Sequence, residues 1–560
     1  MAKNKKEDTL QYLQMPLPSG GRYSKMTKVA FGGLNKRYTL DSGELTMESN
    51  ISTNEYPYLT PSELKKRVLG EYSNPISMFA FNDFLIVIYR KYEAVKIDYI
   101  TADNTVYTST LKESGATSAD DVPRSIVQFN KYEESEDIVN GEYVKKLLIF
   151  PDKKSMDFEI TEDDFVISNM SVDIKTYTND GVKLDDGTIS YLPPDTASHN
   201  YYYKNISTEA AKSEATLYGK AIYKWVDDET DSDNSGWKIS VPPTFPDIKY
   251  ATVHLSRLFG VSDDCVYASG FNDYTNWSLD SIDEYNESNS WFSQTQSNTK
   301  AGGDFTGITT FDSHVICFKR DFMHEIYNTK NPFRLQDIYA EGCIDNRTIQ
   351  DVDGKLFFVS EDNVKIYTGS NPRIVSYNLN MPQYEYAVSG TDNRNYYLYC
   401  EDAYNNKYLY VYDTFTELWS EQRIDSRVLS FGHNKNGMYM LCTDGCLYKM
   451  DTGDYSHEWS FETDLITNKT VDIKHIKKLQ MLVDVVKSAN FNVYILYDDE
   501  EFDKNTSHLV YASKKYGKFP IRVKPRKTAN YGFKLHVEGT GYIKLYELEI
   551  FVEAGGDMYV

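Results

Sequence analysis

An acidic loop over residues 227–236 is the strongest candidate for metal chemistry in this sequence. Its carboxylates are those of Asp227, Asp228, Glu229, Asp231 and Asp233. Asp231, Asp233 and Gly236 match the opening of a twelve-residue calcium loop, in which oxygen ligands alternate along the chain before a sharp turn. The twelfth position, which needs a bidentate glutamate, is Pro242. The ligand set is therefore incomplete, and we expect a solvated acidic loop.

The other residue types that can act as nucleophiles, general bases or metal ligands are not arranged for catalysis. The nine histidines are dispersed without a metal-ligand spacing, and the six cysteines lie mostly in apolar segments, as buried free thiols do. The sequence has no nucleophile elbow, phosphate loop or dinucleotide fingerprint. Carboxylate pairs at 263–264 and 498–499 fit the turns of an acidic β-protein, although two carboxylates on separate strands of a glycosidase remain an alternative. We expect no cofactor, no metal and no enzymatic activity.

The composition narrows the classes of partner. A formal net charge of −23 disfavours bulk binding to nucleic acid or to anionic membranes. One stretch, KKYGKFPIRVKPR at residues 514–526, interleaves cations with aromatics; a strand edge or a contact with an acidic neighbour is favoured there over a nucleic-acid site. The first residues lack the apolar core of a signal peptide, and no apolar run reaches membrane-spanning length. We expect a chain made in the cytosol, with no membrane-spanning segment.

Short strand-like segments recur with a period near 40 residues. Each copy has an apolar strand, an Asp, Asn or Gly turn, a second apolar strand, and a third that ends near Tyr or Trp. Four copies fall between residues 300 and 465, a fifth covers 76–115, and weaker ones cover 124–170 and 248–295. Because one small sheet cannot bury both faces, radial stacking into a β-propeller is the favoured arrangement. A β-sandwich with a coincidental period is the alternative.

The other segments do not follow this rhythm. Residues 1–75, punctuated by prolines, predict an extended arm that carries a strand or two and docks elsewhere, with one or two helical turns at 62–68. Residues 171–247 predict an insertion, with a helix near 208–220. Residues 466–560 contain longer alternating strands, which predict a β-sandwich with a bulge near Tyr546. The predicted propeller therefore comprises residues 76–170 and 248–465, and the fold class is all-β. The 14% aromatic content, including 47 tyrosines, is explained better by strand packing than by a sugar-binding face.

Residues 253–277 (VHLSRLFGVSDDCVYASGFNDYTNW) resemble a recurrent phrase of one protein family. So do residues 307–327 and residues 31–58. The family is that of the β-propeller tail nozzle or hub proteins of short-tailed bacteriophages, often described as head-completion or stabilisation proteins. Outside these phrases the likeness is one of strand rhythm, and residues 171–247 match no pattern of the family.

The resemblance implies a structural virion protein of the phage tail. It implies a homohexameric ring below the portal and head–tail adaptor, in contact with other tail proteins or fibres. The genome would leave through the ring's channel without specific binding, and an acidic wall would suit that passage because like charges repel. We therefore hypothesise that the acidic loop, with Asp227, Asp228, Glu229, Asp231 and Asp233, lies at or near the lumen.

Two other functional classes remain open from the sequence. The first is a carbohydrate- or host-receptor-binding propeller, whose Tyr and Trp side chains would face a ligand. The second is a glycoside-cleaving propeller with two inward carboxylates. Ring formation separates the structural class from both.

Overall fold

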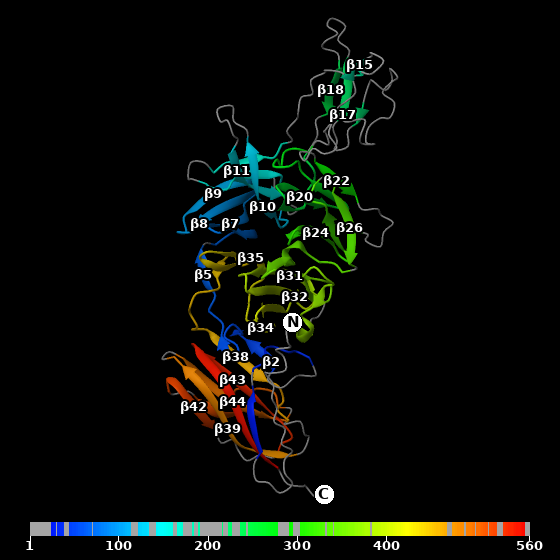
Figure 1. The fold of residues 1–560 in the computed structure, drawn as a ribbon. Coiled ribbons are helices and arrows are strands. Elements are labelled where there is room, and N and C mark those ends of the chain that lie inside the picture. Colours follow the sequence, from blue (N-terminus) through cyan, green and yellow to red (C-terminus); the bar gives the residue numbers. More distant parts are fainter. Residues whose placement is uncertain are drawn as a thin grey trace.

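A computed structural model of the 560-residue chain shows an all-β protein with a propeller above a β-sandwich (Figure 1). It describes residues 24–29, 31–37, 44–69, 71–113, 121–133, 142–160, 165–171, 182–183, 189–190, 215–216, 222–226, 236–241, 245–277, 290–294, 303–330, 333–339, 341–380, 384–467, 473–486, 489–498, 500–512, 515–523 and 530–554. Within these ranges the helical elements are two single 3₁₀ turns, η3 (Asn346–Thr348) and η4 (Tyr377–Leu379).

Seven antiparallel four-stranded sheets form the propeller, and we name them blades A to G. The first three blades, each given from its innermost to its outermost strand, are A, with β6 (Pro75–Ala80), β7 (Phe84–Lys91), β8 (Ala94–Thr101) and β9 (Val106–Lys112); B, with β10 (Ser125–Glu133), β11 (Glu142–Phe150), β12 (Lys154–Asp157) and β13 (Ile167–Asn169); and C, with β19 (Tyr250–His254), β20 (Arg257–Ser262), β21 (Cys265–Ala268) and β22 (Trp291–Gln294).

The next three blades, in the same order, are D, with β23 (Phe305–Phe311), β24 (His314–Lys319), β25 (Met323–Tyr327) and β26 (Arg334–Tyr339); E, with β27 (Gln350–Val352), β28 (Lys355–Val359), β29 (Val364–Tyr367) and β30 (Arg373–Ile374); and F, with β31 (Tyr384–Thr391), β32 (Asn395–Asp402), β33 (Lys407–Asp413) and β34 (Leu418–Gln422).

Blade G is completed by a strand from the other end of the chain. Its first three strands are β35 (Val428–Asn434), β36 (Gly437–Cys442) and β37 (Leu447–Lys449), and its outermost strand is β5 (Lys66–Leu69). The helical turn predicted at residues 62–68 is wrong, because this segment pairs with a strand almost 400 residues away. Sequence periodicity cannot show so distant a partner.

Seven separate apolar clusters fill the seven junctions between neighbouring blades. Six of these clusters lie between successive blades along the chain: A and B, B and C, C and D, D and E, E and F, and F and G. The seventh joins G to A through Met78, Val87, Leu441 and Leu447, so the ring is closed. The prediction of a propeller core is confirmed, and its physical basis is that each sheet buries one face against each neighbour.

Tyrosines contribute to the propeller interior. Tyr396, Tyr399 and Tyr410 are among the largest fully buried side chains, and the Tyr396 hydroxyl donates to Thr348 O at 3.0 Å. A buried ring thus keeps a partner for its polar end. At these three positions the tyrosine rings pack between strands, as we predicted from the aromatic composition.

The C-terminal unit is a sandwich of two sheets around one core. One sheet has the order β1–β44–β39–β42, formed by β1 (Ser24–Val29), β44 (Ile543–Ala554), β39 (Lys474–Val485) and β42 (Gly517–Val523). The other has the order β2–β38–β43–β40–β41, formed by β2 (Leu45–Ser49), β38 (Glu458–Thr463), β43 (Phe533–Thr540), β40 (Asn490–Tyr497) and β41 (His508–Ala512). The β39–β44 register shifts at Tyr546, where the sequence predicted a bulge.

Residues 1–75 do contain strands, as predicted, but their prediction as an arm that docks elsewhere is wrong for the described part of that segment. β1 and β2 belong to the two sandwich sheets, and Phe31, Leu45, Ile51 and Leu59 lie in the sandwich core. The hairpin of β3 (Ile51–Ser52) and β4 (Thr60–Pro61) precedes the closing strand β5. The sandwich also begins at β38, before the predicted boundary at 466.

The N-terminal segment also ties the sandwich to the rim of blade F. Leu34 N–H donates to Trp419 O at 2.9 Å, and Asn50 N–H donates to Glu421 O at 3.1 Å. The Lys36 ammonium pairs with the Glu421 carboxylate at 2.7 Å. The two units therefore share a hydrogen-bonded contact, which a flexible linker alone would not provide.

Between blades B and C the structure describes short strands of the insertion. They are β14 (Val182–Lys183), β15 (Ile189–Ser190), β16 (Ala215–Thr216), β17 (Ile222–Val226) and β18 (Gly236–Val241). Figure 1 shows β17 and β18 on the side of the propeller opposite to the sandwich. The helix predicted near 208–220 lies mostly outside the described residues.

Candidate functional site: the axial cavity of the propeller

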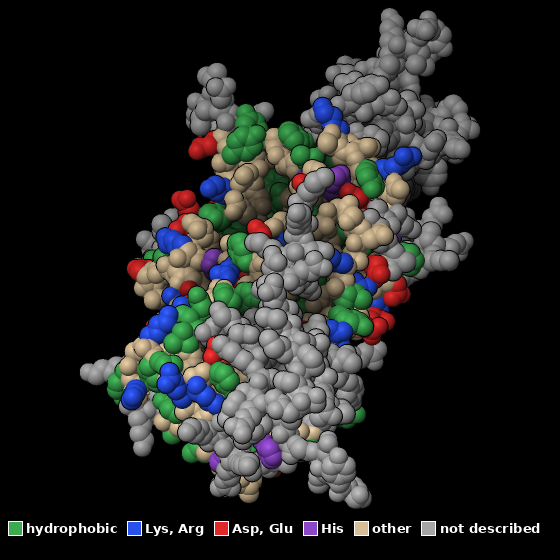
Figure 2. Space-filling view, turned by 60° about the horizontal axis from the view of Figure 1, so that its bottom comes forward, with side chains coloured by type: hydrophobic (Ala, Val, Ile, Leu, Met, Phe, Trp, Pro, Cys, Tyr) green, Lys and Arg blue, Asp and Glu red, His purple; other side chains and the backbone are tan. Residues whose placement is uncertain are grey.

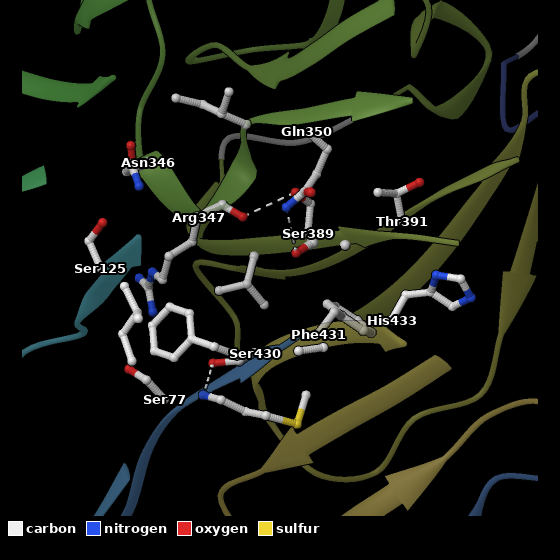
Figure 3. Close-up of a pocket in the computed structure, with 18 of the residues that line it drawn as sticks. Ser77, Ser125, Asn346, Arg347, Gln350, Ser389, Thr391, Ser430, Phe431 and His433 are labelled. Atoms are coloured by element: carbon white, nitrogen blue, oxygen red, sulfur yellow. Dashed lines mark hydrogen bonds between the residues drawn. The ribbon is translucent and has the colours of Figure 1, made fainter. Parts of the chain in front are cut away.

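The inner strands of all seven blades surround a cavity of ≈690 Å³ on the propeller axis (Figure 3). Each blade contributes its first strand, because only that strand reaches the axis. The hydroxyl-bearing residues of its lining are Ser77, Ser125, Thr252, Thr309, Ser389, Thr391 and Ser430. The cavity wall is therefore largely made of small polar side chains and backbone.

Several of these polar groups join one blade to the next. Ser77 Oγ accepts from Arg124 N–H at 3.2 Å between blades A and B, and Ser430 Oγ accepts from Met78 N–H at 3.0 Å between G and A. Ser389 Oγ donates to Arg347 O at 3.0 Å between E and F, a contact drawn in Figure 3. Inner strands have no further strand on the axial side, so side chains take over the hydrogen bonds that a ladder would make.

The other junctions carry equivalent bonds. Ile308 N–H donates to Asn346 Oδ1 at 3.0 Å between D and E, and Thr310 Oγ1 donates to Val253 O at 3.1 Å between C and D. The remaining two junctions are joined by Tyr386 Oη to Val428 O at 2.9 Å and by Tyr132 N to Asn272 O at 3.1 Å. Every junction between neighbouring blades thus carries at least one hydrogen bond, and we call this set of bonds the inter-blade belt.

The charged residues in the lining are cationic, and each is paired with a carboxylate. Arg124 binds Asp152 through Nε and Nη2 at 2.8 and 3.1 Å. Arg347 binds Asp345 through Nε and Nη2 at 3.0 and 2.7 Å.

Lys435 is the third lining cation, and its Nζ lies 2.6 Å from an Asp83 oxygen. Its hydrogen bond lowers the pKa of the Asp83 carboxyl. The described residues of the lining include no Asp or Glu, yet pairing of all three cations with carboxylates limits the attraction of the cavity for anions.

Glycines let the inner strands approach one another. A Cβ added at Gly390 would lie 2.2 Å from the Phe431 Cβ, and one at Gly432 would lie 2.7 Å from the Ala80 Cβ. Both are sub-van-der-Waals contacts across a blade junction. The converging strands therefore require glycine at these positions.

We expect Gly390→Ala to destabilise the protein by about 1–3 kcal/mol, because overpacking forces the F–G junction apart. Thermal unfolding followed by calorimetry measures the effect. Thr391→Ala on the same strand is the control and should cost less. Equal unfolding temperatures for Gly390→Ala and the unaltered chain would show that the junction tolerates the extra methyl.

The acidic residues singled out from the sequence, Asp227, Asp228, Glu229, Asp231 and Asp233, lie outside the described residues. Their proposed place at a lumen stays a prediction. Among the residues that the structure does describe, no group of three or more His, Cys, Asp or Glu could share a metal ion. The six cysteines are free thiols, and five of them are buried.

The sequence patterns did not lead us to predict the residues that line the axial cavity. A signal for them exists, since the strand that precedes each Asn, Asp or Gly turn is the innermost strand of its blade. Small polar residues on those strands, such as Ser77, Ser389 and Ser430, could have been grouped on that basis.

The cationic stretch at residues 514–526 includes β42, an edge strand of the sandwich. Lys518 and Arg522 are exposed, Lys518 Nζ lies 3.9 Å from the centre of the Tyr546 ring, and Pro520 sits between them. Figure 2 shows Lys and Arg side chains gathered over the sandwich. Lys and Pro on an edge strand discourage pairing with another strand, as expected for a solvated edge.

The phrase at residues 253–277 has a packing explanation. The Arg257 side chain is 2% exposed and donates from Nη1 to Ser269 O at 2.6 Å. Trp277 packs edge-on against Phe245, with ring centres 5.1 Å apart. The first contact lies within blade C and the second in the cluster between blades B and C, so the phrase contributes to local packing.

Comparisons with known proteins do not change the fold assignment that follows from the sheet topology. No family model and no curated protein matches the chain. Among solved structures, BamB from Moraxella catarrhalis is 10% identical with a TM-score of 0.34, covering 71% of this chain and 99% of BamB. The β-propeller domain of the Trilobed protease from Pyrococcus furiosus is 9% identical with a TM-score of 0.25, covering 70% and 96%. Likenesses this low say nothing about function. Within the described residues, no helix has the length and apolarity needed to cross a membrane.

Proposed function

We propose that this chain is a structural subunit of the tail of a short-tailed bacteriophage, a nozzle or hub that forms a ring with further copies. In this proposal the ring, a hexamer, binds the portal and head–tail adaptor proteins and contacts other tail proteins or fibres. The genome passes through the ring without specific binding, and the protein has no catalytic role. The resemblance of residues 253–277, 307–327 and 31–58 to that family supports the proposal.

The observation that carries the proposal is the way the chain interlocks its two units. It starts in the sandwich with β1 and β2, enters the propeller to supply β5, completes every blade, and returns to the sandwich at β38. Neither unit is complete without the N-terminal segment. A subunit that transmits force along a tail gains from such interlocking, because the units cannot separate without breaking a sheet.

The axial cavity supports a structural role over passage of DNA through a single propeller. Its ≈690 Å³ cannot hold a duplex whose major groove alone is about 12 Å wide. Ser77, Asn346, Ser389 and Ser430 of its lining are also engaged in the inter-blade belt. In our proposal the DNA channel therefore lies between subunits of the ring.

The experiment is to image the purified protein, alone and with its portal–adaptor complex, by negative-stain microscopy and mass photometry. We expect rings, either free or seated on the adaptor. A chain that stays monomeric and leaves the adaptor unoccupied at micromolar concentration would refute the proposal.

A binding propeller is the second candidate, favoured by two exposed tyrosines. Tyr92 and Tyr404 are 90% and 86% exposed at the turns between the second and third strands of blades A and F. Such rings can stack on sugars. Glycan-array binding by the monomer, lost in Tyr92→Ala and Tyr404→Ala, would favour this candidate, and release of reducing sugar would instead indicate a glycosidase.

A further inference from the structure

One edge of the sandwich concentrates positive charge in a chain that is acidic as a whole. Residues 505–537 contain no Asp or Glu, and most of their Lys and Arg residues lie in or beside the edge strand β42. Residues 456–560 contain as many Lys and Arg as Asp and Glu, so the formal net charge of −23 belongs to residues 1–455. The acidic excess of the chain therefore lies outside the segment that forms the cationic edge.

The cations on β42 and just before it are not neutralised by carboxylates of the same chain. Lys515, Lys518 and Arg522 are exposed, and in the part of the chain that the structure describes none of them forms an ion pair. Asp484 opposes Lys518 in the β39–β42 register, yet the Lys518 ammonium lies over the Tyr546 ring. We call Lys515, Lys518 and Arg522 the basic edge, and its charges are available to a partner.

Exposed carboxylates gather at one end of blades D and E. Asp304 directly precedes β23, Asp321 lies between β24 and β25, and Asp362 lies between β28 and β29. Since successive strands of a blade run antiparallel, the start of the first strand and the turn between the second and third strands lie at the same end of the blade. We call Asp304, Asp321 and Asp362 the acidic end.

The carboxylates of the acidic end also lack a counter-charge. All three are exposed, and the described residues provide none of them with an ion pair. Arg320 and Lys365 lie at the same end of these blades, but they already pair with Glu361 and Glu341. The acidic end is therefore negatively charged, and it complements the basic edge.

The two surfaces lie far apart within one chain. Figure 1 shows β42 at the lower left, at the outer edge of the sandwich, and β24 and β26 of blade D at the upper right, in the propeller. Complementary charges that cannot meet in one chain can pair between two copies. Such attraction also steers the encounter and fixes which surfaces meet.

We propose that the basic edge of one copy binds the acidic end of blades D and E of a second copy. The contact is heterologous, because two different surfaces meet, and repeated heterologous contacts close a ring when the rotation between copies allows it. Tyr516, which is 57% exposed beside Lys515, adds an aromatic ring of the kind enriched at interfaces. Side chains carry the contact, since Lys518 and Pro520 on β42 discourage the addition of another strand. This inference rests on the proposed ring and identifies both sides of its interface.

The test uses two charge-reversed chains. The edge variant combines Lys518→Glu with Arg522→Glu, and the end variant combines Asp321→Lys with Asp362→Lys. Self-association is measured by sedimentation velocity over a concentration series at low salt, with circular dichroism to verify folding. We expect each variant alone to raise the dissociation constant by about tenfold or more, because like charges now face each other.

Mixing the two variants in equal amounts should restore association to that of the unaltered chain. In the mixture an unaltered edge meets an unaltered acidic end, and a reversed edge meets a reversed end, so every contact joins opposite charges. Added salt should weaken both the mixture and the unaltered chain, because exposed charges are screened. A variant that had merely lost its fold could not be rescued in this way.

The matched control combines Glu142→Lys with Glu159→Lys. Both residues are exposed, and they lie at the start of the second strand and after the third strand of blade B, the end opposite to the turn between these strands. The control changes the net charge as much as the end variant does, and it should change the dissociation constant less than about threefold.

Three results would overturn this contact while leaving the proposed ring intact. They are unchanged assembly of the edge variant, including the case in which it loses only binding to duplex DNA; equal weakening by the control; and failure of the mixture to associate. Absence of any self-association in the unaltered chain, even on the portal–adaptor complex, would overturn both the contact and the ring.

Discussion

A chain that begins at Pro75 should fold neither the propeller nor the sandwich. The truncation removes β1 and β2 from the two sandwich sheets and β5 from blade G. It also removes Phe31, Leu45, Ile51 and Leu59 from the sandwich core, where each is at most 4% exposed. Burial of such side chains contributes about 1.5–3 kcal/mol each, so the loss is on the order of 6–12 kcal/mol. That equals the usual net stability of a domain, about 5–15 kcal/mol.

Circular dichroism and limited proteolysis measure this outcome. A chain that begins at Ser24 is the control, because it keeps β1 to β5. A protease-resistant product from the shorter chain, with the β-sheet signal of the control, would show that the N-terminal segment is a dispensable arm after all.

Glu48→Gln should stabilise the protein at neutral pH. Glu48 is 3% exposed between β2 and blade F, with one oxygen accepting from Glu421 N–H at 3.2 Å and the other, Oε1, buried without a hydrogen-bond partner. Burial raises the pKa of the Glu48 carboxyl to about 8; the Glu421 carboxylate adds to this, while its backbone N–H and Lys36 act against it. The carboxyl is therefore largely protonated at pH 7 in the folded protein.

The sign of the pH dependence follows from proton binding. Between pH 4.5, the ordinary pKa of this group, and pH 8, the folded chain holds a proton that the unfolded chain releases. The contribution of Glu48 to stability therefore falls as pH rises through this window and levels off above it. At pH 7 the accumulated penalty is about 3 kcal/mol, at about 1.4 kcal/mol per pH unit.

Glutamine keeps the hydrogen-bond acceptor and removes the titration. We expect a higher unfolding midpoint for Glu48→Gln than for the unaltered chain at pH 7, and nearly equal midpoints at pH 5. Denaturant unfolding at both values measures the difference, with the exposed Glu385→Gln as a control that should change neither. If the difference in unfolding midpoint between Glu48→Gln and the unaltered chain is as large at pH 5 as at pH 7, Glu48 is not protonated in the folded protein as we expect.

Local patterns identified the blades because a blade is a local object. Its strands follow one another through tight turns, and apolar runs such as residues 84–90 or 437–442 show their burial directly. The same patterns failed for β5 and β2, which are short and pair with strands almost 400 residues away or more. A short segment such as Lys66–Leu69 contains no local pattern that identifies the distant strand with which it pairs.

By itself the sequence determined most of the blade strands, the turns between them, their period and the bulge at Tyr546, since each depends on neighbouring residues. Only the tertiary structure decided that seven blades close, that the N-terminal segment completes both units, and that Ser77, Ser389 and Ser430 form part of an inter-blade belt. The physical reason is that hydrogen bonds across blade junctions and burial between sheets join residues far apart in the chain, and their partners exist only once the ring has formed.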